Sequence, residues 1–170
     1  RAVLLLKFMR ILVTGGAGFI GSNLVRALLE QGHAVRVLDN FSSGKEDNLA
    51  EIINDIEVVE GDIRDYWVVS AAVKGIDCVS HQAALPSVPK SIANPLSAHC
   101  INADGTLNML EASRLAGVKR FVFASSSAVY GESPSLPKHE AMIPEPLSPY
   151  AITKLAGEYY CTVYSQLYNF

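Results

Sequence analysis

Two side chains able to hold and move a proton lie one helical turn apart in the segment Ser148-Pro149-Tyr150-Ala-Ile-Thr-Lys154. A serine followed by a proline is typical of a helix start, because serine caps the first N–H groups and proline suits the first helical position. Tyr150 and Lys154 would then share one face of the helix. A free tyrosine ionises near pH ~10 and is a weak base at neutral pH, whereas a neighbouring ammonium favours the phenolate. The spacing predicts Tyr150 as a general base with Lys154 as its partner. An incidental pair on a surface helix is the alternative.

A hydroxyl cluster, Ser125-Ser126-Ser127, directly follows the apolar run Arg120–Ala124. The run is typical of a buried strand. A hydroxyl at its carboxyl end can hydrogen-bond a reacting oxygen and share a proton path with Tyr150. Serines after a strand also form ordinary turns. The position at a strand end favours the functional interpretation.

The clearest signal for a bound ligand is the segment Met9-Arg-Ile-Leu-Val-Thr14-Gly-Gly-Ala-Gly-Phe-Ile-Gly21. A short apolar run ends in a glycine cluster that opens onto a helical pattern. The glycines fit both G-x-G-x-x-G and T-G-x-x-G-x-x-G. They permit a tight strand-to-helix turn and the close approach of a pyrophosphate, whose charge the helix N-terminus stabilises. An ordinary glycine-rich turn is the alternative, but the flanking strand and helix favour a dinucleotide site. We assign to it Gly15, Gly18, Phe19, Ile20 and Gly21.

Acidic residues at the next strand ends refine the identity of this dinucleotide. Asp39 closes the apolar run Ala34–Leu38 at a distance after the glycines that suits hydrogen bonds to a ribose 2′-hydroxyl. Its charge repels a 2′-phosphate, so NAD is favoured over NADP; a loop cap is the alternative. Asp62 and Ile63 follow the next strand and are predicted to bracket the adenine, with the carboxylate on the exocyclic amine and the aliphatic side chain on the ring. A plain turn at Asp62 is the competing interpretation.

The composition describes an ordinary globular domain. The chain has 170 residues, of which 49% are hydrophobic and 18% charged, with a net charge of −3. It offers no basic field for nucleic acid. Residues 1–8 are too short to span a membrane and carry no cleavage pattern, so we expect an upstream extension there and one domain over residues 9–170. No metal site is predicted, because the cysteines lack metal-ligand spacing. They indicate reduced thiols and a cytoplasmic location: Cys78, Cys100 and Cys161.

Strand and helix patterns alternate along the chain, which predicts an α/β fold with a doubly wound parallel sheet of order 3-2-1-4-5. Ligands bind such sheets at the carboxyl ends of the strands, where every motif above falls. A loop from His81 is expected to run through Pro86 and Pro89. The expected strands are Ile11–Val13, Ala34–Leu38, Ile56–Val59, Asp77–Ser80 and Arg120–Ala124. The expected helices are Ile20–Gln31, Glu46–Ile53, one ending near Val73, Pro95–Leu115 and one from Pro149.

These motifs together resemble the extended short-chain dehydrogenase/reductase family, and within it the NAD-dependent sugar-nucleotide epimerases and dehydratases. The resemblance extends from Met9 to Phe170 and implies a Rossmann domain. Its matching segments are TGGAGFIGSNL (14–24), VLDNFSSGKEDNL (37–49), GDIRD (61–65), HQAALPSVPKSI (81–92), NADGTLNMLEA (102–112), FASSSAVYGE (123–132) and SPYAITKLAGE (148–158).

The resemblance implies roles for further residues. Tyr150 would be the catalytic base and Ser126 would supply the active hydroxyl. Lys154 would be the partner of Tyr150 and would also hydrogen-bond the nicotinamide ribose. Asn102 would organise the site. Ala83 and Ala84 would line the nicotinamide pocket. The remaining cofactor residues would be Asn40, Ser42, Gly44 and Gln82, and the substrate contacts Ser87, Val88, Ser126, Ser127 and Tyr150.

The residues after Ser126 bear on the reaction. By the resemblance, nucleotide-sugar dehydratases carry an acidic pair at this point, whereas here Ser127-Ala128 follows. The segment HQAALPSVPKSI is similar to 4-epimerases that act on UDP-N-acetylhexosamines as well as UDP-hexoses. The implied reaction is transient oxidation at C4 with bound NAD, and the implied partner is a UDP-sugar. A dehydratase or decarboxylase of nucleotide sugars stays an alternative within the family.

Members of this family are implied to be about twice as long as this chain, so we expect an N-terminal fragment that lacks the C-terminal substrate region and turns over poorly. A homodimer is implied through the helices Pro95–Leu115 and Pro149–Leu167. A non-catalytic NAD-binding domain or a degenerate gene product is the alternative from another class. Intact Ser126, Tyr150 and Lys154 favour the enzyme.

Overall fold

Five short strands form one parallel sheet in the order β3-β2-β1-β4-β5, as predicted. The computed structural model describes residues 8–132 and 136–170, so the extension expected at residues 1–8 lies, apart from Phe8, outside the described residues. The strands are β1 (Arg10–Thr14), β2 (Ala34–Asp39), β3 (Ile56–Glu60), β4 (Cys78–His81) and β5 (Arg120–Phe123).

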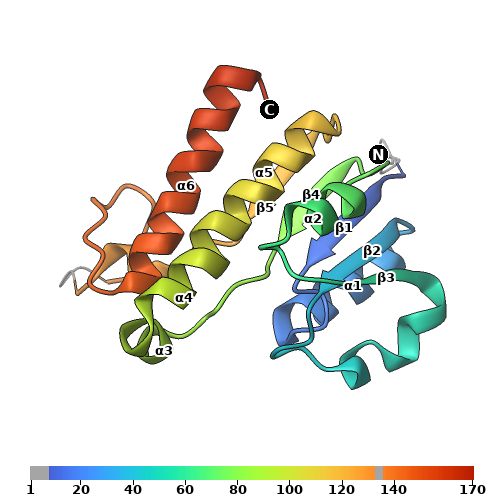
Figure 1. Cartoon of the computed structure of the whole chain (residues 1–170), viewed down its shortest axis with the longest axis horizontal. Coiled ribbons are helices and arrows are strands. Elements are labelled where there is room, and N and C mark those ends of the chain that lie inside the picture. The colour runs from blue at the N-terminus through green and yellow to red at the C-terminus, as the bar shows by residue number, and fades with distance from the viewer. Residues whose placement is uncertain (1–7, 133–135) are drawn as a thin grey trace, which may run out of the picture.

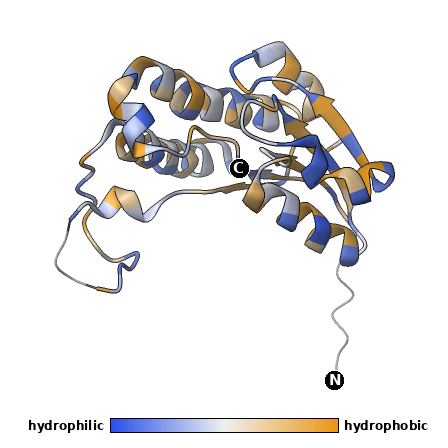
Figure 2. Ribbon diagram, turned by 90° about the horizontal axis from the view of Figure 1, so that it is seen from below, coloured by the Kyte–Doolittle hydropathy of each residue, from blue (hydrophilic) through white to orange (hydrophobic). Residues whose placement is uncertain are grey.

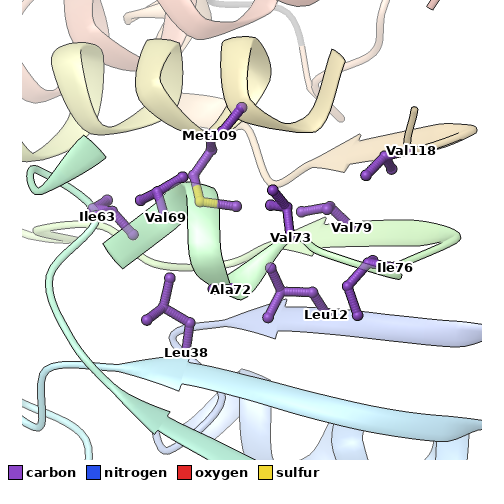
Figure 3. Close-up of a cluster of buried hydrophobic side chains, with 11 residues drawn as sticks. Leu12, Leu38, Ile63, Val69, Ala72, Val73, Ile76, Val79, Met109 and Val118 are labelled. Atoms are coloured by element: carbon purple, nitrogen blue, oxygen red, sulfur yellow. The ribbon is translucent and has the colours of Figure 1, made fainter. Parts of the chain in front are cut away.

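Helices cover both faces of the sheet because side chains alternate along each strand. In β1, Ile11 and Val13 point to a cluster under α1 (Phe19–Glu30). Leu12 points to the opposite cluster, which packs against α2 (Tyr66–Ala72) and α5 (Gly105–Leu115) (Figure 3). Hydrophobic and hydrophilic residues alternate along the helices, as expected for helices with one buried side (Figure 2).

The remaining helices lie beside the β5 end of the sheet. The predicted helix over Pro95–Leu115 is α4 (Pro95–His99), a π-helical segment (Cys100–Asp104) and α5 in succession. The long helix α6 (Pro149–Tyr168) runs alongside α5 (Figure 1). It begins at the predicted residue, with the Ser148 hydroxyl accepting the N–H of Ala151 at 3.1 Å.

Two local predictions were wrong. The loop expected through Pro89 contains a short helix, α3 (Val88–Ala93), because Ser87 caps it and a proline fits its first turn. The helix expected over Glu46–Ile53 is a pair of 3₁₀ segments, Glu46–Asn48 and Ala50–Asp55. A further 3₁₀ turn, Ser127–Tyr130, follows β5.

The register places the ends of the strands level with one another. Thr14 pairs with Leu38 on one side and with His81 on the other, and His81 pairs with Phe123. The segments that follow β1, β2, β4 and β5 therefore emerge along one edge, which is where ligands bind in open parallel sheets. Among the described residues, no helix is long and apolar enough to cross a membrane, and no cluster of potential ligands could hold a metal ion.

Candidate active site

The glycine-rich turn between β1 and α1 is shaped by close backbone contacts. Gly15 has φ of +66°, and a Cβ there would lie 2.8 Å from the backbone nitrogen of Ala83. A Cβ on Gly21 would overlap the carbonyl oxygen of Gly15. Gly18 caps α1, and the side chains of Phe19 and Ile20 next to it are 84% and 68% exposed. Since only glycine fits at Gly15 and Gly21, the turn presents bare backbone at a helix N-terminus, which suits a pyrophosphate.

Asp39 lies at the end of β2 with 8% of its surface exposed. Its Oδ2 accepts the N–H of Ala17 at 2.9 Å, and its Oδ1 accepts the N–H of Phe41 at 2.9 Å. A Cβ on the buried Gly44 would come within 3.0 Å of Asp39 Oδ2 and 2.8 Å of the Ala17 methyl group. Asp39 therefore holds the glycine-rich turn as well as supplying the carboxylate predicted for a ribose, since each oxygen can accept a further hydrogen bond.

A polar cluster joins the ends of β2 and β3. Asn40 donates to Asp62 Oδ2 at 2.9 Å, and its own Oδ1 accepts the N–H and the hydroxyl of Ser42 at 3.1 and 2.7 Å. Arg64 forms a two-pronged ion pair with Asp62, with contacts of 2.9 and 2.7 Å. The hydrogen bonds from Arg64 hold the pKa of the Asp62 carboxyl well below its usual range.

The structure buries the side chain of Ile63, which was predicted to lie on the adenine ring. Ile63 is only 6% exposed and packs in the cluster under α2 and α5, where a Cβ on Gly105 would approach it to 2.6 Å. Its aliphatic side chain therefore offers little free surface to a ring. At this position the backbone of Ile63 stays available to an adenine. The Asp62 carboxylate already accepts three hydrogen bonds from Arg64 and one from Asn40, so it would have to release one of them to accept the exocyclic amine.

The segment after β4 is tied to both neighbouring elements. The N–H of Ala83 donates to Thr14 Oγ1 at 3.1 Å, and the N–H of Leu85 donates to Asn102 Oδ1 at 2.7 Å. Gln82 turns back toward its own strand and donates to Ser80 Oγ at 3.0 Å. Ala83 and Ala84 are half-buried. Asn102 thus holds the loop that was predicted to line the nicotinamide pocket.

The predicted base and its partner lie on the first turns of α6. Lys154 is 4% exposed, and its Nζ donates to the carbonyl of Ala124, at the end of β5, at 2.8 Å. The ammonium also lies 4.9 Å from the centre of the Phe123 ring. Burial lowers the pKa of Lys154 to about 8. Tyr150 is half-buried one turn earlier, and its N–H donates to Ser91 Oγ on α3 at 3.1 Å.

Close packing brings α6 to the strand. A Cβ on Gly157 would overlap the Phe123 ring, with a second ring atom at 2.8 Å. The absence of a side chain therefore lets the helix approach β5 closely enough for Lys154 to reach the Ala124 carbonyl. Ser126 lies two residues beyond that carbonyl, and its hydroxyl accepts the N–H of Ala128 at 3.2 Å.

The serines assigned to substrate occupy loop positions at the same edge. Ser127 is exposed and begins the 3₁₀ turn after β5, Ser87 caps α3, and Val88 is 36% exposed. Ser125 is engaged elsewhere, since its hydroxyl donates to Glu158 on α6. Of the three serines, Ser126 and Ser127 therefore stay available to a ligand.

A family model, the NAD dependent epimerase/dehydratase family, matches residues 11–170. The chain belongs to this family. The match includes the glycine-rich turn, the strand ends and α6, so the resemblance inferred from the motifs is confirmed.

Relatives with curated functions and solved structures agree. The chain is 44% identical over 170 residues to UDP-glucose 4-epimerase of Mycolicibacterium smegmatis, covering 95% of this chain and 53% of that protein. It is similar to the crystal structure of the Thermus thermophilus UDP-glucose 4-epimerase complex with NAD, with TM-score 0.89 and 45% identity, covering 95% of this chain and 52% of that one. A UDP-N-acetylglucosamine 4-epimerase from Methanobrevibacter ruminantium, in complex with UDP-N-acetylmuramic acid, matches with TM-score 0.89 and 39% identity, covering 96% of this chain and 52% of that one. The chain spans about half the length of these relatives.

The fold does not distinguish reactions within the family. A dTDP-glucose 4,6-dehydratase from Streptomyces venezuelae, with NAD and TYD bound, matches with the same TM-score of 0.89 at 38% identity, covering 95% of this chain and 53% of that one.

Several residues at these strand ends and helices are not singled out by sequence patterns. His81 and Thr106 join the ends of β1 and β4 to α5 by buried hydrogen bonds, and Thr153 joins α6 to Asn102. Phe123 contacts the Lys154 ammonium. Thr106, Thr153 and Phe123 carry no chemical signal in the sequence, since threonines in a helix and a phenylalanine in an apolar strand are typical of any core. The signal that could have singled out His81 is its polar side chain at the end of β4, a strand whose other residues are buried.

Proposed function

We propose that this chain is the NAD-binding and proton-transferring part of a nucleotide-sugar 4-epimerase acting on a UDP-hexose or UDP-N-acetylhexosamine. The observation that carries the proposal is the contact of Lys154 Nζ with the Ala124 carbonyl. Through this contact the helix that bears Tyr150 lies beside the serines after β5, on the sheet edge that carries the glycine-rich turn. The relatives named as 4-epimerases support the same conclusion.

The residues proposed to hold NAD fit that molecule in kind. Gly15, Gly18 and Gly21 leave room for a pyrophosphate, and the N–H groups that start α1 supply donors. Asp39 would accept a ribose hydroxyl, and its charge disfavours a 2′-phosphate. When bound, NAD supplies reversible hydride acceptance.

The chain itself would supply proton transfer and orientation. Tyr150 would take the proton of the C4 hydroxyl as general base, and Ser126 would hydrogen-bond the same oxygen. Lys154 stays largely protonated at neutral pH, because its pKa of about 8 lies above that value. Two of its three N–H donors stay available after the bond to Ala124. They can stabilise the Tyr150 phenolate and a ribose hydroxyl.

The two residues after Ser126 favour epimerisation over dehydration. Elimination of water needs an acid and a base beside the sugar, whereas Ser127 and Ala128 carry no titratable group. The exposed Ser127 hydroxyl can bind a sugar but cannot act as an acid–base pair at neutral pH.

The test uses two proteins. The chain itself is titrated with NAD and NADP while its thermal unfolding is followed, and NAD alone is expected to stabilise it.

A hybrid then joins residues 9–170 to the remaining C-terminal part of the Thermus thermophilus relative. Incubated with UDP-glucose and NAD, it should yield UDP-galactose, and its Tyr150→Phe variant should not. Loss of water from the sugar, measured by mass spectrometry, would instead indicate a dehydratase. A folded hybrid that binds NAD yet converts nothing would refute the epimerase.

A homodimer and a cytoplasmic role in nucleotide-sugar metabolism belong to the same proposal. Apolar side chains on α6 are exposed, and Leu96 on α4 is 78% exposed, a pattern typical of a covered interface. All three cysteines are free, which fits a reducing compartment. Sedimentation of the hybrid should give a dimer, and Val163→Asp should give a monomer. The exposed large hydrophobic residues of α6 are Ile152, Tyr159, Tyr160, Val163, Leu167 and Tyr168.

A further inference from the structure

His81 lies at the end of β4 inside the molecule, with 1% of its surface exposed. Its Nδ1 is 2.7 Å from Thr14 Oγ1 at the end of β1, and its Nε2 is 3.0 Å from Thr106 Oγ1 on α5. The rings of Phe121 and Phe123 lie beside it, with centroid distances of 5.7 and 6.0 Å. The imidazole is therefore a polar bridge through an apolar layer, from the glycine-rich turn to a helix.

The number of protons fixes the direction of every bond in this bridge. Thr106 has one hydroxyl proton, which it donates to the carbonyl of Asn102 at 2.6 Å. Toward His81 it can therefore only accept, so Nε2 must carry the hydrogen. Burial, helped by the charge of Lys154, lowers the pKa of His81 to about 3, so the ring is neutral and Nδ1 is bare. The hydroxyl of Thr14 consequently donates to Nδ1 while accepting the N–H of Ala83.

One end of the bridge reaches the proposed cofactor turn. Thr14 directly precedes Gly15, whose left-handed conformation packs against Ala83. The Thr14 hydroxyl is therefore the contact between the His81 ring and this turn.

The other end reaches the proposed base. Asn102, in the π-helical segment, donates to Thr153 Oγ1 at 3.1 Å, and the Thr153 hydroxyl donates to the carbonyl of Tyr150 at 2.7 Å. The side chain of Asn102 also accepts the N–H of Leu85 at 2.7 Å. π segments are frequent at functional sites, and this one directs both the carbonyl and the side chain of Asn102 into the network.

We propose that His81 is a positioning residue that, as the neutral Nε2–H tautomer, couples the glycine-rich turn to Asn102 and through it to the helix that carries Tyr150. This inference rests on the proposed function for the role of Tyr150, but the tautomer and the coupling to NAD binding are properties of the chain alone.

The first test observes the ring directly. In the ¹⁵N-labelled chain, long-range ¹H–¹⁵N NMR correlations distinguish the two neutral tautomers and imidazolium. His81 should show Nε2–H and no titration between pH 5 and 8. A His33→Leu variant removes the signals of the other buried histidine and so secures the assignment. An Nδ1–H tautomer, or titration in this range, would overturn the inference.

The second test asks whether a substitution at Thr106, away from the glycine-rich turn, changes the affinity for NAD. Thr106→Val removes the hydroxyl but not the volume and should raise the Kd for NAD about fivefold to tenfold, the size of one lost buried hydrogen bond. Thr106→Ser should restore binding to within about twofold. Thr162→Val is the matched control, because Thr162 makes the same type of bond to the carbonyl of Glu158 on the exposed side of α6.

Equal NAD affinity in Thr106→Val, Thr106→Ser and the unmodified chain would overturn the coupling. If Thr106→Val does not fold, the tautomer measurement on the unmodified chain decides. An inactive hybrid would refute the proposed function and leave the tautomer unaffected, whereas an Nδ1–H signal would refute this inference and leave NAD binding unaffected.

Discussion

Replacement of Asp39 by asparagine tests whether one carboxylate serves both the fold and the cofactor. Its two oxygens accept the N–H groups of Ala17 and Phe41, each at 2.9 Å, and only 8% of the residue is exposed. Asparagine has one acceptor oxygen, so one of the two N–H groups would face an NH₂ donor and lose its partner.

The structure sets the size of the effect. An unpaired buried N–H costs about 1–3 kcal/mol, and each kcal/mol lowers the melting temperature of a chain of this size by roughly 2–4 °C. The Asp39→Asn variant without NAD should therefore unfold about 2–12 °C lower than the unmodified chain. Binding of NAD should weaken about tenfold, because a charged acceptor becomes neutral, while NADP should bind better because a repulsion is removed.

Differential scanning calorimetry and titration calorimetry measure the two effects separately. Asp47→Asn is the matched control, since it makes the same chemical change at an exposed position and should shift stability by less than about 0.5 kcal/mol. An Asp39→Asn variant that melts with the unmodified chain would refute the structural role. An unchanged preference for NAD over NADP in a folded variant would refute the cofactor role.

Three further predictions rest on the contacts of the glycine-rich turn and α6. Gly21→Ala should abolish NAD stabilisation in thermal-shift assays, because the methyl group would overlap the Gly15 carbonyl. Gly157→Ala should destabilise the chain by about 1–2 kcal/mol in urea unfolding, since overpacking against Phe123 exceeds the gain in helix propensity, and Phe123→Leu should restore part of the loss. The pKa of Lys154 is lowered by burial to about 8, so the folded state binds fewer protons than the unfolded state between pH 8 and about 10.5. The free energy of unfolding should therefore rise with pH across that window relative to Lys154→Met, and a pH-independent difference would contradict the assigned burial.

The sequence predicted the features that depend on local pattern. Strand order follows from the alternation of apolar runs and helical segments, and the start of α6 from Ser148-Pro149. The tight turn from β1 into α1 follows from the glycine cluster. Each of these features is fixed by neighbours in the chain or by the fold class, so a pattern suffices.

The features that escaped prediction depend on contacts between distant segments. The burial of Ile63 arises from the close approach of Gly105, and the π segment has no composition that distinguishes it from an α-helix. Neither the burial of Ile63 nor the π segment can be recognised from a short stretch of sequence. The bridge through His81 joins β1, β4 and α5, so its existence depends on the register of strands and helices that fold together.

The contacts also distinguish two properties of the site, its affinity for NAD and its turnover of substrate. The groups assigned to NAD are held by other groups of this chain: Asp39 by backbone N–H groups, Ala83 by Thr14, and Lys154 by the Ala124 carbonyl. A site whose binding groups are already held in place loses little conformational entropy when NAD binds. NAD affinity should therefore be measurable on this chain by itself. The residues assigned to the sugar, by contrast, include the exposed Ser127 and Val88. Turnover should accordingly depend on whatever covers that side of the site, and joining residues 9–170 to the C-terminal part of a relative should change turnover far more than the Kd for NAD.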